Sequence, residues 1–157
     1  NDNMPRKCVE DAIKMLLKNK INPKNAKIAV LGLGFRGEVT DTRLSPTYDV
    51  VNEFLKKECT VTVHDPYIFE DKQLPKSVSL TKDLIIATQQ ADLIFISSDH
   101  KIYSKLDSKS FSKTGENLII YSGNNGGGQS LNINGCSIRA KGGNLMLIIQ
   151  HLINIIK

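Results

Sequence analysis

The chain has 157 residues, of which 40% are hydrophobic and 24% are charged, and its formal net charge is +5. This composition is typical of an ordinary soluble globular chain of one domain. The positive charge favours anionic ligands, but no block of five or six basic residues occurs and only 6% of residues are aromatic, so no nucleic-acid partner is predicted.

The three cysteines, Cys8, Cys59 and Cys136, are scattered and form no C-x-x-C pair. An odd number of isolated cysteines argues against a disulfide framework and predicts a reducing, cytoplasmic location. Metal-ligand spacing is absent, so no metal site is expected. We also expect no membrane segment, because no signal peptide opens the chain and the apolar run 145–156 contains polar residues and is too short to cross a bilayer.

A helix is predicted at the start of the chain, where Pro5 suits a first turn and Asn3 is a candidate cap. The helical spacing predicts one apolar stripe made of Val9, Ile13, Leu16 and Leu17. A helix that opens the chain with no strand before it indicates a segment cut from a longer protein.

Residues 28–31 form an unbroken apolar run that suits a strand buried on both faces of a parallel sheet. The run leads directly into Gly32-x-Gly34-x-x-Gly37, the glycine spacing of a dinucleotide-binding turn. In such a turn the backbone N–H groups and a helix N-terminus face a phosphate. The alternative is a tight turn with a purely structural role.

The residues after Gly37 do not continue as an ordinary NAD-binding turn does. Thr40 and Thr42 are poor residues for a helix interior, and the Ser45-Pro46 step is typical of a helix start. We therefore predict an extended loop as far as residue 44 and a helix from about Ser45. The next acidic residue at a strand end, Asp65, comes later than the roughly 20 residues of the NAD fingerprint.

The rest of the chain alternates between strands and helices. Strands are predicted at 60–64, 78–80, 92–97 and 118–121, and a helix at 81–90 with Leu84, Ile85 and Thr88 facing inward. This order predicts an α/β fold with a doubly wound, Rossmann-like parallel sheet preceded by an N-terminal helix. After residue 122 the pattern is weaker: a glycine-rich loop, a candidate hairpin of 131–133 with 137–139, and helical spacing over 145–156.

The stretch Gly-Leu-Gly-Phe-Arg-Gly-Glu-Val-Thr-Asp-Thr-Arg-Leu-Ser-Pro at 32–46, followed by His64-Asp65-Pro66, resembles the C-terminal domain of nucleotide-sugar dehydrogenases. That family oxidises UDP-glucose, GDP-mannose or UDP-N-acetylmannosamine, and the pattern is most similar to the N-acetylmannosamine branch. The resemblance covers about residues 1–121. It fails where the family has Asp-Gly-Arg-Asn, because this chain has Ser122-Gly123-Asn124-Asn125.

The resemblance implies three regions: the end of a connecting, dimer-forming helix and a linker at 1–25, a nucleotide-sugar-binding domain at 26–122, and a divergent segment at 123–157. It implies that the chain is a fragment lacking the N-terminal NAD domain. The implied ligands are a UDP-sugar and NAD, and the implied assembly of the whole enzyme is a homodimer. Two alternatives are a stand-alone module that binds NAD at the Gly32 turn, and a degenerate remnant that binds nothing.

The same resemblance implies the site residues. Gly32, Gly34, Phe35 and Arg36 would bind the nucleotide sugar, where the family usually has lysine in place of Arg36. Arg43 would reach the diphosphate of NAD. The alternatives are a solvated Arg36 and a loop ion pair between Arg43 and Asp41.

Four further residues are of types that often have chemical roles. Asp65 would hold a ribose hydroxyl or cap the following turn, and His64 and His100 have no sequence partner that implies catalysis. His100 resembles an Asp-His pair of the family, but a helix cap by the preceding aspartate explains the pattern equally well. The surroundings of Cys136 do not match the segment around the family nucleophile, so no catalytic residue is predicted in this chain.

Overall fold

The computed structural model describes residues 3–98, 100–105, 119–122, 129–133 and 136–140. Seven strands form one sheet in the order β3-β2-β1-β4-β5-β7-β6. Their bounds are Lys27–Leu31 (β1), Thr60–His64 (β2), Ser79–Thr81 (β3), Leu93–Ile96 (β4), Ile119–Ser122 (β5), Gln129–Ile133 (β6) and Cys136–Ala140 (β7). All neighbours pair in parallel except β6 and β7, which form an antiparallel hairpin.

β1 occupies the middle of the parallel part of the sheet. Ile28 aligns with Val61 of β2 on one side and with Leu93 of β4 on the other. From Ile28 to Leu31 the strand is almost fully buried, as its unbroken apolar sequence predicts. Because β2 and β4 flank β1, the residues that follow these three strands meet at the same edge of the sheet.

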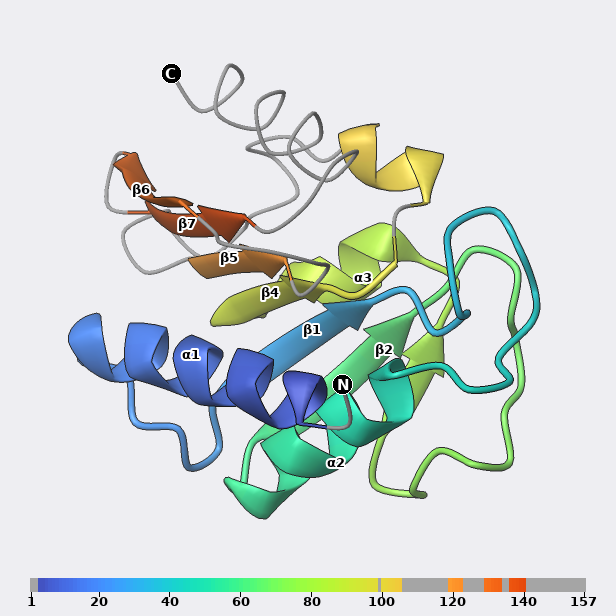
Figure 1. Ribbon diagram of the computed structural model, residues 1–157, viewed down its shortest axis with the longest axis horizontal. Coiled ribbons are helices and arrows are strands. Elements are labelled where there is room, and N and C mark those ends of the chain that lie inside the picture. The colour runs from blue at the N-terminus through green and yellow to red at the C-terminus, as the bar shows by residue number, and fades with distance from the viewer. Residues whose placement is uncertain (1–2, 99, 106–118, 123–128, 134–135, 141–157) are drawn as a thin grey trace.

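Helices cover both faces of the sheet, which confirms the predicted doubly wound architecture. Figure 1 shows α1 (Met4–Lys18) and α2 (Thr47–Lys56) on one face and α3 (Leu84–Thr88) on the other. A short 3₁₀ helix, Lys101–Lys105, follows β4. The β6–β7 hairpin extends the sheet into the segment 123–157, whereas the possible helix at 145–156 lies outside the described residues.

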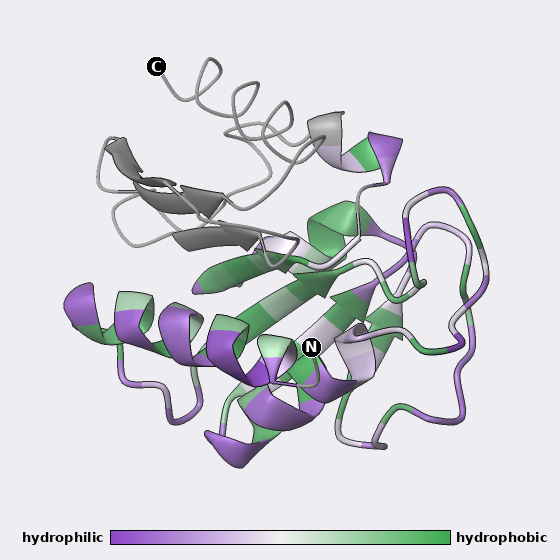
Figure 2. Ribbon diagram, viewed as in Figure 1, coloured by the Kyte–Doolittle hydropathy of each residue, from purple (hydrophilic) through white to green (hydrophobic). Residues whose placement is uncertain are grey.

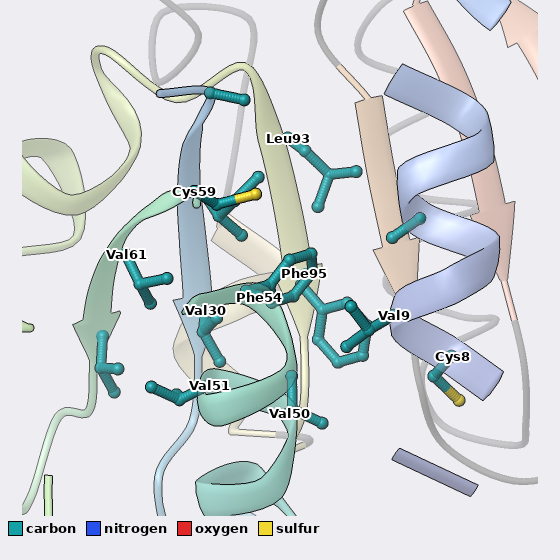
Figure 3. Close-up of a cluster of buried hydrophobic side chains, with 14 of the residues drawn as sticks. Cys8, Val9, Val30, Val50, Val51, Phe54, Cys59, Val61, Leu93 and Phe95 are labelled. Carbon is teal, nitrogen blue, oxygen red and sulfur yellow. The ribbon is translucent and has the colours of Figure 1, made fainter. Parts of the chain in front are cut away.

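The core lies between the sheet and the α1–α2 layer. In Figure 2 the central strands are mostly green, whereas α1 and α2 alternate between purple and green, as amphipathic helices do. Phe54 of α2 packs edge-on against Phe95 of β4, with ring centroids 5.6 Å apart (Figure 3). Val9 and Cys8 of α1 belong to the same cluster. α1 is therefore part of this domain's core, although the boundary at residue 25 itself remains a prediction.

Three local predictions need correction. The buried stripe of α1 includes Cys8, Ala12 and Met15, while Leu17 is 57% exposed. α2 begins at Thr47, two residues after the predicted start. α3 begins only at Leu84, because Asp83 caps it by accepting hydrogen bonds from the N–H groups of Ile85 and Ile86, and it ends at Thr88. The side chain of Ile85 is 61% exposed, whereas the sequence predicted that it faces inward.

Candidate functional site

The candidate site lies at the carboxyl edge of the parallel strands, where open α/β sheets place their ligands. Four segments meet there: the glycine turn after β1, the loop that continues to α2, the turn after β2 and the residues after β4. In Figure 1 the loops after β1 and β2 extend together beyond the arrowheads.

Gly32 is required by the close approach of the chain after β4. Its φ is +98°, and a Cβ atom built there would lie 2.5 Å from Cβ of Ser98 and 2.8 Å from the Ser98 backbone nitrogen. Gly34 has no positive φ, and the nearest atom to a Cβ there is the Val39 carbonyl oxygen at 3.0 Å. The first glycine therefore serves the packing of two strand ends, and the second is less constrained.

The N–H groups of the glycine turn donate to a side chain of the protein. Oδ2 of Asp65 accepts hydrogen bonds from the N–H groups of Leu33 at 2.9 Å and Gly34 at 3.2 Å. Oδ1 accepts from the N–H groups of Tyr67 and Ile68. The turn-capping interpretation of Asp65 is thus confirmed. The N–H groups of Leu33 and Gly34 face this carboxylate and not an open phosphate site, and ligand contact by Gly32 or Gly34 stays a prediction.

Asp65 is fully buried. Burial opposes its ionisation, but hydrogen bonds from His100 and from the N–H groups of Tyr67 and Leu33 outweigh that effect and lower the pKa of Asp65 below its ordinary value. A buried carboxylate with this many donors is a fixed internal anion that holds the strand ends together.

His100 joins Asp65 to the loop after β1. Its Nδ1 accepts the Glu38 N–H at 2.9 Å, and its Nε2 lies 3.2 Å from Oδ2 of Asp65. An N–H can only donate, so Nδ1 carries no proton and Nε2–H donates to Asp65. Sequence analysis missed this contact across 35 residues, although both residues follow strands that flank β1. The aspartate before His100 lies outside the described residues.

Glu38 ties the loop to the two neighbouring segments. Its carboxylate accepts hydrogen bonds from the Tyr67 hydroxyl and from the Lys101 N–H at 2.8 Å. These bonds, the one from Tyr67 first, lower the pKa of Glu38. Glu38 holds a left-handed backbone conformation with φ of 63°. A shallow cleft of about 500 Å³ lies beside this junction, lined by Glu38, Pro66, Tyr67, His100, Lys101 and Ile102.

The carbonyl groups of the turn are bonded as completely as its N–H groups. Hydroxyl groups donate to them: Ser45 to the Leu33 carbonyl at 2.8 Å, Thr47 to that of Gly32 at 3.0 Å and Ser98 to that of Gly34 at 2.7 Å. The Ser-Pro-Thr segment therefore anchors the far end of the loop to its beginning.

The tip of the loop is closed by the Phe35 N–H, which donates to the Asp41 carbonyl at 2.8 Å. Two side chains point into solvent there: Phe35 is 55% exposed, and Arg36 is exposed. Within the described part of the chain, Arg36 forms no ion pair. A fixed loop thus presents an aromatic ring and a guanidinium side by side in the sequence.

Arg43 forms the loop ion pair that was the alternative to a ligand contact. Its Nε and Nη2 donate to the two oxygens of Asp41 at 3.0 and 2.9 Å, although its side chain is 88% exposed. These hydrogen bonds lower the pKa of Asp41 to about 2. The next residue, Leu44, is 93% exposed and has φ of 57°, an unusual conformation for leucine.

A second buried histidine lies behind the site. His64 Nε2 is 3.1 Å from the Lys82 carbonyl, which can only accept, so Nε2 carries a proton. Nδ1 lies 3.0 Å from the Tyr103 hydroxyl, which also donates to the His64 carbonyl at 3.3 Å. Burial lowers the pKa of His64. With both ring nitrogens in hydrogen bonds inside the protein, His64 has a structural role.

A family comparison decides what kind of domain carries this site. The model of the UDP-glucose/GDP-mannose dehydrogenase family, UDP binding domain, matches residues 29–126. The chain belongs to this family. The match includes the glycine turn, the whole loop, Asp65 and His100, and it confirms the resemblance drawn from the loop motif.

Relatives within the family agree with this assignment. UDP-N-acetyl-D-mannosamine dehydrogenase of Pyrococcus horikoshii is 32% identical over 125 residues, which are 80% of this chain and 28% of that protein. UDP-N-acetyl-D-glucosamine 6-dehydrogenase of Salmonella typhi is 26% identical over 69% of this chain and 25% of its own length. The chain thus spans about a quarter of the length of these relatives.

Solved structures show the same fold. The NDP-N-acetyl-D-galactosaminuronic acid dehydrogenase of Methanosarcina mazei superposes with a TM-score of 0.67 at 28% identity, over 76% of this chain and 25% of that chain. The UDP-D-ManNAc dehydrogenase of Pyrococcus horikoshii gives 0.63 at 30% identity, over 80% of this chain and 28% of that chain. The predicted Rossmann-like class is confirmed.

Cysteine and metal chemistry have little support in the described ranges. Cys8 and Cys59 are buried, and burial raises the pKa of Cys59 to about 11. The side chain of Cys136, on β7, lies outside the described part. Among the described residues, no three or more His, Cys, Asp or Glu side chains gather in a way that could hold a metal ion. No described helix has the length and apolarity to span a membrane.

Proposed function

We propose that this chain binds the UDP-sugar of an NAD-dependent nucleotide-sugar 6-dehydrogenase, which oxidises the sugar to a UDP-uronic acid. The observation that carries the proposal is the exposed Phe35–Arg36 pair on a loop anchored at both ends. The ring offers an apolar face to the base or sugar. The guanidinium offers paired donors to the diphosphate oxygens.

NAD has a different relation to this chain. The N–H groups of Leu33 and Gly34 donate to the Asp65 carboxylate, so they are not available to the NAD diphosphate. Arg43 fits a contact with NAD bound elsewhere, because the Arg43–Asp41 ion pair is exposed to solvent and can exchange for a phosphate. When bound, NAD would accept the hydride. We place no catalytic residue in the described part of this chain.

Location and assembly follow the same proposal. We place the whole enzyme in the cytoplasm as a homodimer and assign UDP, not GDP, as the nucleotide. The relatives named above as UDP-sugar dehydrogenases support the nucleotide. The three scattered cysteines, which form no C-x-x-C pair, favour a reducing compartment.

Calorimetric titration of the chain with UDP-N-acetylmannosamine, UDP-glucose and NAD tests the proposal. We expect a UDP-sugar to bind, and Arg36→Ala to weaken it about tenfold to a hundredfold, since a hydrogen bond to a charged group contributes about 1.5–3 kcal/mol. Lys24→Ala is the matched control, because Lys24 is an exposed cation before β1, at the opposite edge of the sheet.

The two alternatives give different results in the same experiment. A stand-alone NAD module would bind NAD alone and keep that affinity in Arg36→Ala. A remnant that binds nothing would show no rise in melting temperature at millimolar ligand, whereas a ligand at about 100 times its dissociation constant stabilises the fold by about 2.7 kcal/mol.

A further inference from the structure

We propose that Asp65 and His100 are positioning residues. Asp65 holds the glycine turn through its backbone N–H groups, and the uncharged form of His100 holds the backbone of Glu38 and thereby the position of Arg36. We call this set of contacts, together with the His100–Asp65 bond, the lock. The inference rests on the proposed function for its effect on UDP-sugar binding. The lock itself is defined by contacts between described residues. These contacts span the ends of β1, β2 and β4.

The first part of the lock is the saturation of Asp65. A carboxylate has about four lone-pair positions. Asp65 accepts from four backbone N–H groups and from His100, all in a fully buried setting. A ligand phosphate brought to the Leu33 and Gly34 N–H groups would face this buried anion. The turn is therefore a rigid base for the loop, and the ligand anion is left to side chains at the tip.

The second part is the protonation state of His100. The neutral ring with its proton on Nε2 satisfies both partners at once, because Nδ1 accepts from Glu38 and Nε2–H donates to Asp65. A second proton would sit on Nδ1 and point at the Glu38 N–H. Two donors would then face each other, and the Glu38 bond would break.

Several ionisable groups surround this ring. Asp65 touches Nε2, and the rings of Tyr67 and Tyr103 pack edge-on at centroid distances of 5.5 and 5.6 Å. The Glu38 carboxylate is bonded to Tyr67 and to the Lys101 N–H, and His64 lies beyond Tyr103. The geometry shows the effect of a second proton on the ring: the hydrogen bond from the Glu38 N–H to Nδ1 is lost.

The consequence reaches the ligand side of the loop. Glu38 stands two residues after Arg36 and holds a left-handed backbone conformation, so the His100 bond fixes a backbone that is not intrinsically favoured. Without that bond, the backbone at Glu38 keeps only the bonds of the Glu38 carboxylate to Tyr67 and to the Lys101 N–H, so we expect the loop around Arg36 to be held less firmly. We therefore expect acid to weaken UDP-sugar binding without unfolding the domain.

The test follows the ¹⁵N signals of the His100 ring and the amide signals of Glu38 and Arg36 between pH 8 and pH 5. We expect the neutral ring to carry its proton on Nε2, and both amides to shift with the same midpoint as the ring. In His100→Asn, whose amide oxygen can replace Nδ1 but does not titrate, both amides should stay constant. His64→Asn should keep the wild-type profile. A proton on Nδ1 of the neutral ring, or amides that ignore the titration, would overturn the proposal.

Affinity gives the second readout. UDP-glucose is the probe, because it lacks the terminal phosphate monoester that titrates near pH 6. Binding should weaken about tenfold from pH 8 to pH 5 in the wild type, the effect of about one hydrogen bond, and stay flat in His100→Asn. A flat wild-type profile would refute the link to binding. Absence of binding at pH 8 would refute the proposed function, while the amide titration would still decide the lock.

Discussion

Replacing Gly32 with alanine should damage the domain more than any other single methyl group added to the loop. Left-handed backbone costs a non-glycine residue about 1–2 kcal/mol. The new Cβ would also lie 2.5 Å from the Ser98 Cβ and 2.8 Å from the Ser98 nitrogen, an overlap that only a backbone shift relieves. Overpacking of this kind costs about 1–3 kcal/mol. The total of about 2–5 kcal/mol is a large share of an ordinary domain stability of about 5–15 kcal/mol.

Urea unfolding followed by circular dichroism measures this loss, with Gly34→Ala as the matched control. At Gly34 the backbone is not left-handed and the nearest atom is 3.0 Å away, so we expect a loss of about 1 kcal/mol. The midpoint should fall in both variants while the urea dependence stays constant.

The double variant Gly32→Ala with Ser98→Gly separates the two causes. Removing the Ser98 side chain relieves its contact with the new Cβ but leaves the backbone nitrogen in place. We expect a favourable coupling energy of about 0.5 kcal/mol or more. If Gly32→Ala costs no more than Gly34→Ala, the argument from close approach of β1 and β4 is refuted.

Three further predictions concern the buried layer and α3. Asp83→Ala should cost about 1 kcal/mol in urea unfolding, because two N–H groups lose their cap; no loss would refute the cap. Burial lowers the pKa of His64, so the unfolded chain binds more protons than the folded chain at acid pH. The free energy of unfolding should therefore fall as the pH drops below about 6.5, by at most about 1.4 kcal/mol per pH unit. His64→Asn should lack this slope. With the pKa of Cys59 raised to about 11, about one thiol in a thousand is ionised at pH 8, and alkylation should require urea.

The sequence was sufficient for the architecture. The apolar run of β1, the glycine turn after it and the delayed start of α2 were each visible as local patterns, and the alternation of strands and helices predicted a doubly wound parallel sheet. The loop motif also identified the family. These features depend on residues close together in the chain, so a single sequence contains them.

The internal lock could not be predicted in the same way. Asp65 and His100 are 35 residues apart, and only the pairing of β2 and β4 with β1 brings them together. The glycine spacing predicts that the N–H groups of the turn face a phosphate. It does not reveal that two of them donate to a carboxylate of the protein itself. The prediction of the buried face of α1 was partly wrong for a related reason. α1 packs against both α2 and the sheet, so its buried face lies away from Leu17.

An amide chemical-shift map of the ¹⁵N-labelled chain during titration with UDP-N-acetylmannosamine tests the central claim most directly. We predict that the largest shifts fall on Phe35, Arg36 and their neighbours at the loop tip, and that the hydrogen-bonded amides of Leu33 and Gly34 move little. Shifts centred on Leu33 and Gly34, or on the groove between α1 and α2 that Arg6, Asn52 and Lys56 help to line, would contradict the account.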